Sequence, residues 1–158
     1  MTTSDSASVS SRWVKWWAAV SVSLLLCGPS YSQFAMVPTP LPAPHSSSDA
    51  ETELAYAVVA AKHIYATFPI RIFKGRLPPL LYGVAVTETD IDGKGNVVEV
   101  RMRRKPSAPE VEPWILSLIR RAGPFPAPTK LGKVTHVEVW LVHRSGNFQL
   151  HTLTEGQD

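Results

Sequence analysis

Two segments with alternating apolar and polar side chains, joined by an Asp-Gly turn, constrain the fold of this chain more than any other feature. The segments are Leu81–Ile91 and Val97–Arg104, and the residues between them, Asp92–Asn96, read Asp-Gly-Lys-Gly-Asn. Asp, Asn and Gly accept the positive φ angles that tight hairpin turns require. Alternation around such a turn predicts an antiparallel β-hairpin.

Two helices are predicted, one before and one after the hairpin. The first, Glu51–Thr67, carries apolar side chains at helical spacing and ends at a Phe-Pro pair. The second begins at a capping-box pattern, Ser107–Glu110, and runs to Ala122, where a Gly-Pro pair stops it. The predicted apolar stripes hold Leu54, Val58, Ala61, Tyr65 and Phe68 in the first helix, and Val111, Ile115, Leu118 and Ala122 in the second.

A third strand is predicted over Lys133–His143, and Phe148–Leu153 is a candidate for a short fourth strand. Each strand has one apolar face, and two helices are available to cover it. The expected fold is therefore α+β, a two-layer sandwich with both helices on one face of a three-stranded or four-stranded antiparallel sheet. We expect the domain to span residues 51–153 and residues 154–158 to form a disordered tail.

The sheet face turned away from the helices is the first candidate binding surface. A tryptophan among arginines is the composition that interface hot spots favour. The alternative is a solvated face on which opposite charges pair across the strands. Six side chains are predicted to project from this open face: Glu99, Arg101, Arg103, His136, Glu138 and Trp140.

An edge of the sheet is the second candidate. Either Lys133–His143 or the short Phe148–Leu153 segment offers unpaired backbone groups to a partner strand. Which of them is open depends on whether the short segment pairs with the third strand.

The N-terminal segment has the layout of a secretory signal peptide. Arg12 and Lys15 precede an uncharged apolar run, Trp16–Cys27, and a Gly-Pro break and small serines follow. The run is shorter than the ~20 residues that a membrane-spanning helix needs. We therefore expect residues 1–32 to be removed by cleavage between Ser32 and Gln33. The alternative is that the run is retained as an anchor.

Composition narrows the class of protein further. The chain has one cysteine, which lies inside the apolar run, so the processed protein has no disulfide and must rely on a packed core. The formal net charge is +3 with acids interleaved among the bases, which argues against nucleic acid as a partner. Alternating prolines and a serine run predict an extended linker over residues 33–50.

Several segments, taken in order, resemble the C-terminal domain of TonB and, more distantly, that of TolA. The resemblance covers about residues 65–150, and the hairpin and the Phe-Pro-Ala-Pro segment are its most specific parts. The matching segments are Gly83–Val86, Ile91–Val100, the helix Val111–Ala122, Pro124–Pro128, Leu131-Gly132 and the strand Val134–Val142.

The resemblance implies a periplasmic, non-catalytic module that binds a protein or peptide and needs no cofactor. TonB itself pairs a sheet edge with a receptor segment. Two departures separate this chain from an energy transducer: residues 13–27 contain no histidine, and the spacer is short. We therefore expect an exported periplasmic binding module with a partner in the cell envelope. The alternative is a membrane-tethered accessory of TonB-like energy transduction, in contact with the membrane only if the N-terminal segment is retained.

A small periplasmic metal-binding protein or enzyme is the third reading. His136, His143 and His151 lie close together near the C-terminus. A zinc site needs three or four such ligands in one place, whereas His136 and His143 should point to opposite faces of their strand. We therefore expect no metal and no catalytic residues.

Overall fold

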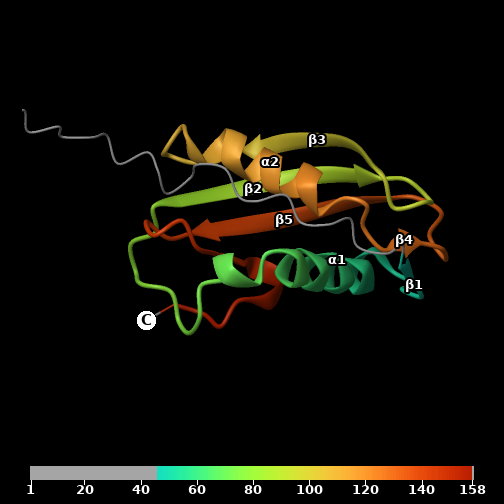
Figure 1. Ribbon diagram of the computed structural model, residues 1–158, viewed down its shortest axis with the longest axis horizontal. Helices are drawn as coiled ribbons and strands as arrows, with labels where there is room; N and C mark the ends of the chain where they lie inside the picture. The colour runs from blue at the N-terminus through green and yellow to red at the C-terminus, as the bar shows by residue number, and fades with distance from the viewer. Residues whose placement is uncertain (1–45, 158) are drawn as a thin grey trace, which may run out of the picture.

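An antiparallel sheet with two helices on one of its faces forms the body of the protein (Figure 1). The structure is a computed structural model and describes residues 46–157. Its elements are β1 (Ser47–Ser48), α1 (Glu53–Thr67), the short 3-10 helix η2 (Pro69–Arg71), β2 (Gly83–Ile91), β3 (Val97–Arg104), α2 (Val111–Ala122), β4 (Ala127–Pro128), β5 (Val134–Val142), β6 (Phe148–Leu150) and the 3-10 helix η3 (His151–Leu153). The four-stranded sheet has the order β3-β2-β5-β6, and this confirms the predicted α+β class, with the short fourth strand present.

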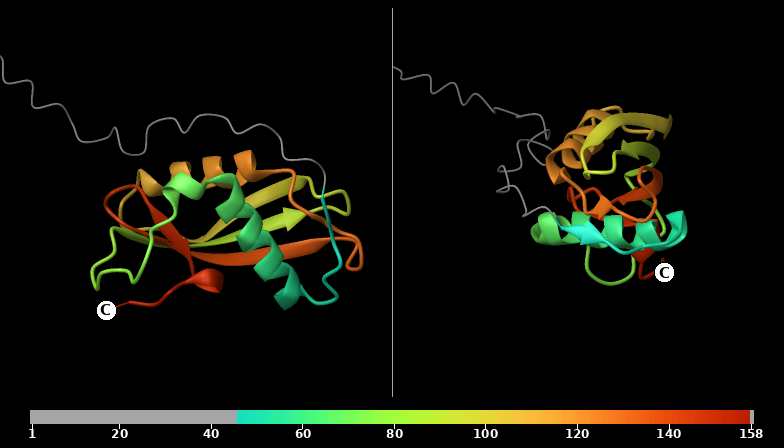
Figure 2. Two further views of the ribbon diagram at one scale, coloured as in Figure 1. Left: turned by 60° about the horizontal axis from the view of Figure 1, so that its bottom comes forward. Right: turned by 90° about the vertical axis from the view of Figure 1, so that its right-hand side faces the viewer.

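The two helices divide the covered face of the sheet between them. Helix α2 packs on β2 and β3, and α1 packs on β5 and η3 (Figure 2). Their buried side chains join one apolar cluster with those of the sheet. Neither helix would hold its shape alone, because ordering a chain costs about 1–2 kcal/mol per residue in backbone entropy. Burial against the sheet offsets this cost.

Helix α1 buries only part of the predicted stripe: Ala61 and Phe68 are buried as expected, but Leu54 is not. Thr52 caps the helix, because its side-chain oxygen accepts a hydrogen bond from the backbone N–H of Ala55. Leu54 is 80 % exposed, whereas Tyr56 is fully buried and donates its hydroxyl to the backbone oxygen of Pro126 at 2.7 Å. Apolar side chains project from most sides of this helix, so the spacing of apolar residues alone does not determine which side is buried. The buried residues are Tyr56, Ala60, Ala61 and Ile64.

Helix α2 buries the predicted stripe but does not begin with a capping box. The Glu110 carboxylate accepts a hydrogen bond from the Tyr82 hydroxyl instead of a backbone N–H at the helix start. The Ser107 hydroxyl donates to the backbone oxygen of Tyr82. Both side chains therefore tie the start of α2 to the beginning of β2. The confirmed stripe is Val111, Ile115, Leu118 and Ala122.

The hairpin turn between β2 and β3 confirms the strongest sequence signal. The Asp92 carboxylate accepts hydrogen bonds from the backbone N–H groups of Lys94 and Asn96, both at 2.8 Å. Hydrogen bonds from Asn96 hold the pKa of Asp92 below its usual value. Gly95 has a φ of 88°, and a Cβ there would lie 2.0 Å from the backbone oxygen of Phe125. The turn is therefore fixed by its own hydrogen bonds and by close packing.

The predicted disordered tail is wrong for residues 154–157. The Thr154 hydroxyl and the Glu155 backbone N–H both donate to Oε1 of Gln149. Leu77 donates its backbone N–H to the carbonyl of Gly156 at 3.0 Å. A buried amide at Gln149 requires partners, and the last residues supply them.

The predicted linker over residues 33–50 also ends in ordered structure. Strand β1 pairs in parallel with β4, and Ser48 is buried. Residues 33–45 lie outside the described part of the chain, as do the predicted signal peptide 1–32 and its cleavage site between Ser32 and Gln33. Within residues 46–157, no helix has the length and apolar character needed to span a membrane.

Candidate functional site

The helix-facing side of β5 includes two charged or titratable side chains, which reverses the predicted orientation of this strand. His136 is 4 % exposed, Glu138 is 3 % exposed and Trp140 is fully buried. Val137 is 43 % exposed instead. The prediction that His136, Glu138 and Trp140 project from the open face is therefore wrong, and these side chains are not available to a partner.

Packing of Trp140 explains the reversal. Shifting the phase of a strand by one residue moves every side chain to the other face. The Trp140 ring packs against Phe148 with ring centroids 4.9 Å apart, and its Nε1 donates to the Thr87 hydroxyl at 3.0 Å. Aromatic rings bury the largest apolar area of any side chain, so placing Trp140 inside outweighs placing the alternate valines there.

Glu138 has a structural role in the core. Its Oε1 atom accepts hydrogen bonds from the backbone N–H groups of Val139, at 3.0 Å, and Thr152, at 3.3 Å. The carboxylate thus links β5 to η3. Burial raises the pKa of Glu138, because desolvation penalises its charged form more than these hydrogen bonds favour it.

His136 is buried without a hydrogen-bond partner for either ring nitrogen among the described residues. Its Nε2 atom lies 3.9 Å from Oε2 of Glu138, beyond hydrogen-bond range. Desolvation lowers the pKa of His136 to about 4. The His136 ring is therefore neutral near pH 7. Both His136 and Glu138 are buried in the core, where a substrate has no direct access to them.

The open face carries an ion-pair network along β2 and β3, where Glu99, Arg101 and Arg103 project as predicted. Arg101 Nη1 lies 2.7 Å from Oδ2 of Asp90 and 2.6 Å from Oε2 of Glu99. Arg103 Nη1 lies 3.2 Å from Oε1 of Glu88. Hydrogen bonding from Arg101 lowers the pKa of Asp90. Opposite charges thus pair across β2 and β3, which fits the solvated-face alternative.

The sheet edge expected at β5 is covered along part of its length. Strand β6 pairs with Trp140–Val142, and β6 is itself bridged on its outer side by Ile72. Strand β3 stands at the other end of the sheet order, and no described strand pairs with its outer side. The edge that no described strand covers along any of its length is therefore β3, an eight-residue strand that we did not single out from the sequence.

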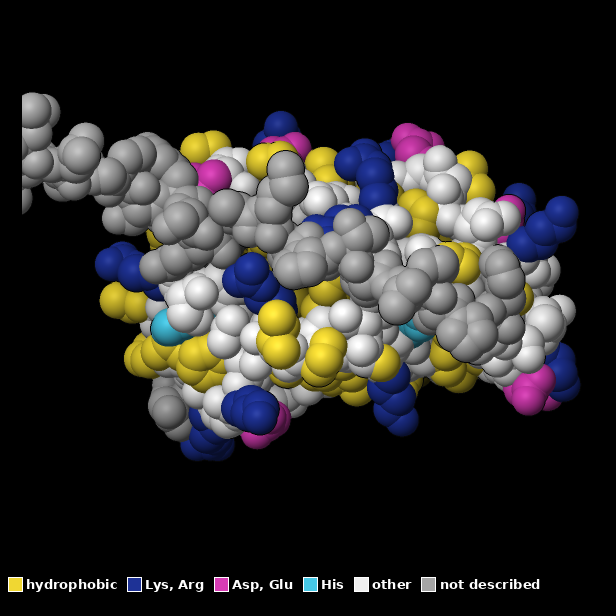
Figure 3. Space-filling view, viewed as in Figure 1, with side chains coloured by type: hydrophobic (Ala, Val, Ile, Leu, Met, Phe, Trp, Pro, Cys, Tyr) yellow, Lys and Arg dark blue, Asp and Glu magenta, His cyan; other side chains and the backbone are white. Residues whose placement is uncertain are grey.

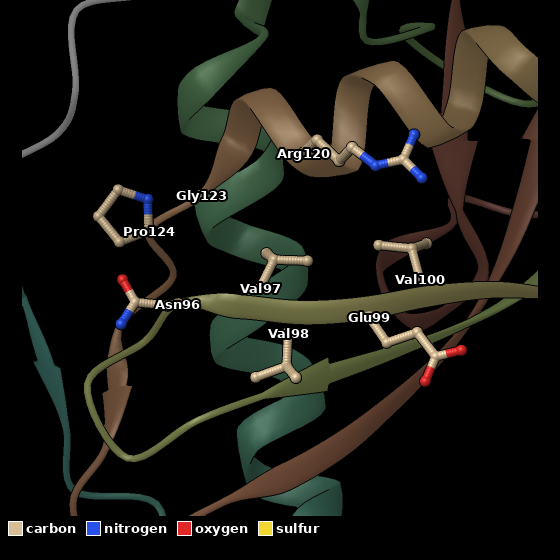
Figure 4. A pocket seen from close by; sticks show the side chains of 8 residues that line it. All are labelled: Asn96, Val97, Val98, Glu99, Val100, Arg120, Gly123 and Pro124. Atoms are coloured by element: carbon tan, nitrogen blue, oxygen red, sulfur yellow. The ribbon is translucent and has the colours of Figure 1, made fainter.

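A groove of about 430 Å³ runs between this edge and the C-terminal end of α2. Figure 4 shows Val97 and Val100 pointing from β3 toward α2, with Val98 and Glu99 on the other side of the strand. The pairing register passes from Asp90–Glu99 to Ile91–Val97 and leaves Val98 as an extra residue, a β-bulge. The groove is lined by Asn96, Val97, Val98, Glu99, Val100, Arg120, Gly123 and Pro124.

Arg120 is the exposed cation of this groove. It extends from α2 above Val100 in Figure 4, and it forms no ion pair with any other residue in the described range 46–157. Glu99, the acidic residue that lines the groove, is already paired with Arg101. The groove therefore presents an apolar floor and one unneutralised guanidinium.

The C-terminal histidines are not brought together. His143 lies in the turn after β5, where its Nδ1 is 2.9 Å from the Ser145 hydroxyl. His151 is exposed on η3, and His136 is in the core. Over residues 46–157, no group of three or more His, Cys, Asp or Glu side chains is placed to hold a metal ion.

The sequence did not predict the positions of two residues that contact or belong to α2, Arg120 and His63. Arg120 fits the negative end of the α2 dipole in sequence, and only the packing of α2 beside β3 shows that it lines the groove. His63, in α1, has its Nε2 atom 2.7 Å from the backbone oxygen of Ala122 at the end of α2. No local pattern predicts a contact between residues so far apart in the chain.

Comparison with protein-family models, with curated proteins and with solved structures finds no match to this chain.

On the side of the molecule shown in Figure 3, lysine and arginine side chains lie in several separate places.

Proposed function

We propose that this protein is a non-catalytic binding module that takes an extended peptide segment of a partner protein along β3. One observation carries the proposal: β3 has no described strand on its outer side and lies beside a groove of about 430 Å³. An unpaired edge offers a row of backbone donors and acceptors to an added strand. Pockets beside the edge then select alternate side chains of that strand.

The side chains around the edge suit this role. Val98 is 69 % exposed at the bulge, and Val97 and Val100 form the apolar floor of the groove. Charged residues on β3 would discourage indiscriminate pairing with other edges, and Arg101 and Arg103 already have acidic partners. A specific partner therefore gains affinity from the backbone and selectivity from the groove.

The resemblance to the TonB C-terminal domain supports the same class of function, because the element order α1-β2-β3-α2-β5 is the order that the resemblance implies. The open edge differs, since β6 occupies part of the edge next to β5. The proposal includes export to the periplasm, because residues 1–32 have the layout of a signal peptide. The partner would then be a protein of the cell envelope. N-terminal sequencing of the protein from cell envelopes tests this: a start at Gln33 supports export, and retention of residues 1–32 favours a tethered accessory of energy transduction.

Two matched substitutions test the site. Val98→Lys places a charge at the open edge, and Val137→Lys places the same charge on the open face of β5. Both proteins are compared with wild type for binding to linear peptides selected from a phage-displayed library of eight-residue sequences. We expect Val98→Lys to weaken binding on the order of tenfold and Val137→Lys to leave it unchanged. Loss only in Val137→Lys would move the site to the open face.

A further inference from the structure

We infer that the peptide carries an acidic side chain at the position that faces Arg120. This inference rests on the proposed strand addition at β3 and specifies the chemistry of its partner. Successive side chains of an added strand alternate between the two faces of the sheet. Those on the helix side enter the groove between Val100 and α2, where Arg120 is exposed.

The charges around the groove select an anion. Glu99 lines the groove, but its side chain lies on the side of β3 away from Arg120, and its carboxylate is 2.6 Å from Arg101 Nη1. Arg120 has no acidic partner among the described residues. A peptide carboxylate here would form a charge-assisted and geometrically specific pair, because a guanidinium offers a planar fork that matches a carboxylate. A peptide lysine or arginine at the same position would meet an unneutralised like charge.

The apolar floor sets the remaining pattern. Val97 and Val100 point into the groove, so we expect β-branched or other apolar residues at the helix-side positions next to the acid. On the opposite face, the added strand would run beside Glu99 and Arg101, which form an ion pair. Small polar residues suit those positions. The expected ligand is thus an extended segment that alternates polar and apolar residues, with one carboxylate on the apolar side.

A second copy of this chain is the rival occupant of the edge. Antiparallel pairing of two β3 strands around Val100 would align Glu99 of one copy with Arg101 of the other, which is favourable. The same symmetry places both copies of Arg120 near the twofold axis, because Arg120 and Val100 line one groove. Two unpaired guanidinium groups would then face each other, and such like-charge juxtaposition disfavours the pairing. An acidic peptide removes this conflict.

The test is a charge reversal. Wild type, Arg120→Glu and Lys62→Glu are used to select binders from the phage-displayed library of eight-residue peptides. Lys62→Glu is the matched control, because Lys62 is also an exposed cation but lies on α1, which packs on β5 and η3, outside β3 and the groove. Circular dichroism and thermal unfolding confirm that all three proteins are folded. Selected peptides are then synthesised for fluorescence anisotropy, with their acidic residue kept or replaced by its amide.

We expect wild type and Lys62→Glu to enrich Asp or Glu at one fixed position, and Arg120→Glu to enrich Lys or Arg there. Amide replacement should weaken binding to wild type on the order of tenfold, and added salt should weaken it as well. Enrichment of extended peptides without a charge preference at that position would overturn this inference and leave strand addition standing. If no peptide is enriched, or if the protein forms a dimer that Val98→Lys dissociates, both proposals are overturned.

Discussion

His136 and Glu138 face each other across 3.9 Å in the core, between the Nε2 atom of the ring and Oε2 of the carboxyl group. Neither of these two atoms has a hydrogen-bond partner among the described residues. Desolvation favours the neutral form of each group. It lowers the pKa of His136 to about 4 and raises the pKa of Glu138. Two titratable groups are thus held in a core that tolerates their charges poorly.

Acid should therefore destabilise the fold through His136. Its pKa is 6.5 in the unfolded reference state and about 4 when folded. Between these values the unfolded chain binds more protons, so the free energy of unfolding falls as pH falls from 6.5 and levels off below 4. Over this pH range His136 therefore lowers the free energy of unfolding by about 3 kcal/mol. Glu138 acts in the opposite direction, since its raised pKa makes protonation favour the folded state.

The His136→Val variant isolates this effect. Urea unfolding of wild type and variant at pH 7.5 and pH 4 gives the difference in stability at each pH. We expect the wild type to lose about 3 kcal/mol relative to the variant on acidification. A difference that stays constant with pH would show that His136 does not titrate in the core. Tyr65, whose hydroxyl accepts a hydrogen bond from the backbone N–H of Leu150, and the exposed His151 are present in both proteins.

Trp140→Ala should unfold or severely destabilise the protein, because removing a fully buried tryptophan costs about 3–5 kcal/mol. Thr87→Val should cost about 1–3 kcal/mol, since it leaves the Trp140 Nε1–H group unpaired in the core. Trp140→Phe removes that donor. The double variant Thr87→Val with Trp140→Phe should therefore lose less than the sum of the two single variants. Additive losses in chemical denaturation would contradict a direct bond between the two residues.

Gly95→Ala should be more destabilising than Gly75→Ala. Both glycines have positive φ angles, 88° and 80° respectively. A Cβ at Gly95 would lie 2.0 Å from the backbone oxygen of Phe125, whereas one at Gly75 meets nothing within 4 Å. Positive φ alone costs about 1–3 kcal/mol for a non-glycine residue, so Gly75→Ala measures that cost and Gly95→Ala adds the clash. Equal melting temperatures for the two variants would refute the close packing of the hairpin turn.

Gln149→Leu should release two surface segments together. The Gln149 amide donates to the carbonyls of Phe73 and Gly75 and accepts hydrogen bonds from Thr154 and Glu155. Losing these bonds should abolish hydrogen-exchange protection of the Leu77 and Glu155 amides while the amides of central strand β2 stay protected. Unchanged exchange at Leu77 would mean that Gln149 does not hold the tail.

The element order, the hairpin and the α2 stripe follow from local patterns in the sequence. Asp92 and Gly95 specify their turn through short-range geometry, and α2 has polar residues on one side, which leaves one choice of buried face. Such features need no knowledge of distant contacts. For this reason the α+β class is predictable from the residues alone.

Long-range contacts decide which face of a strand is buried and which edge of the sheet is covered, and local sequence patterns do not contain these contacts. Valines alternate with His136, Glu138 and Trp140 on β5, so either face could be the apolar one until Trp140 packs on Phe148. Strand β6 returns to pair with part of β5, which leaves β3 as the edge that no described strand covers. Arg120 becomes part of the groove only through the packing of α2 beside that edge.

Backbone hydrogen exchange on β3, measured with and without a selected eight-residue peptide, tests strand addition most directly. Binding along the edge predicts that amides of Val97–Arg104 which face away from β2 become protected, in alternation along the strand. Amides on β5 and β6 should change little. Protection that appears on β5 or on the open face, with β3 unaffected, would contradict the proposed binding edge.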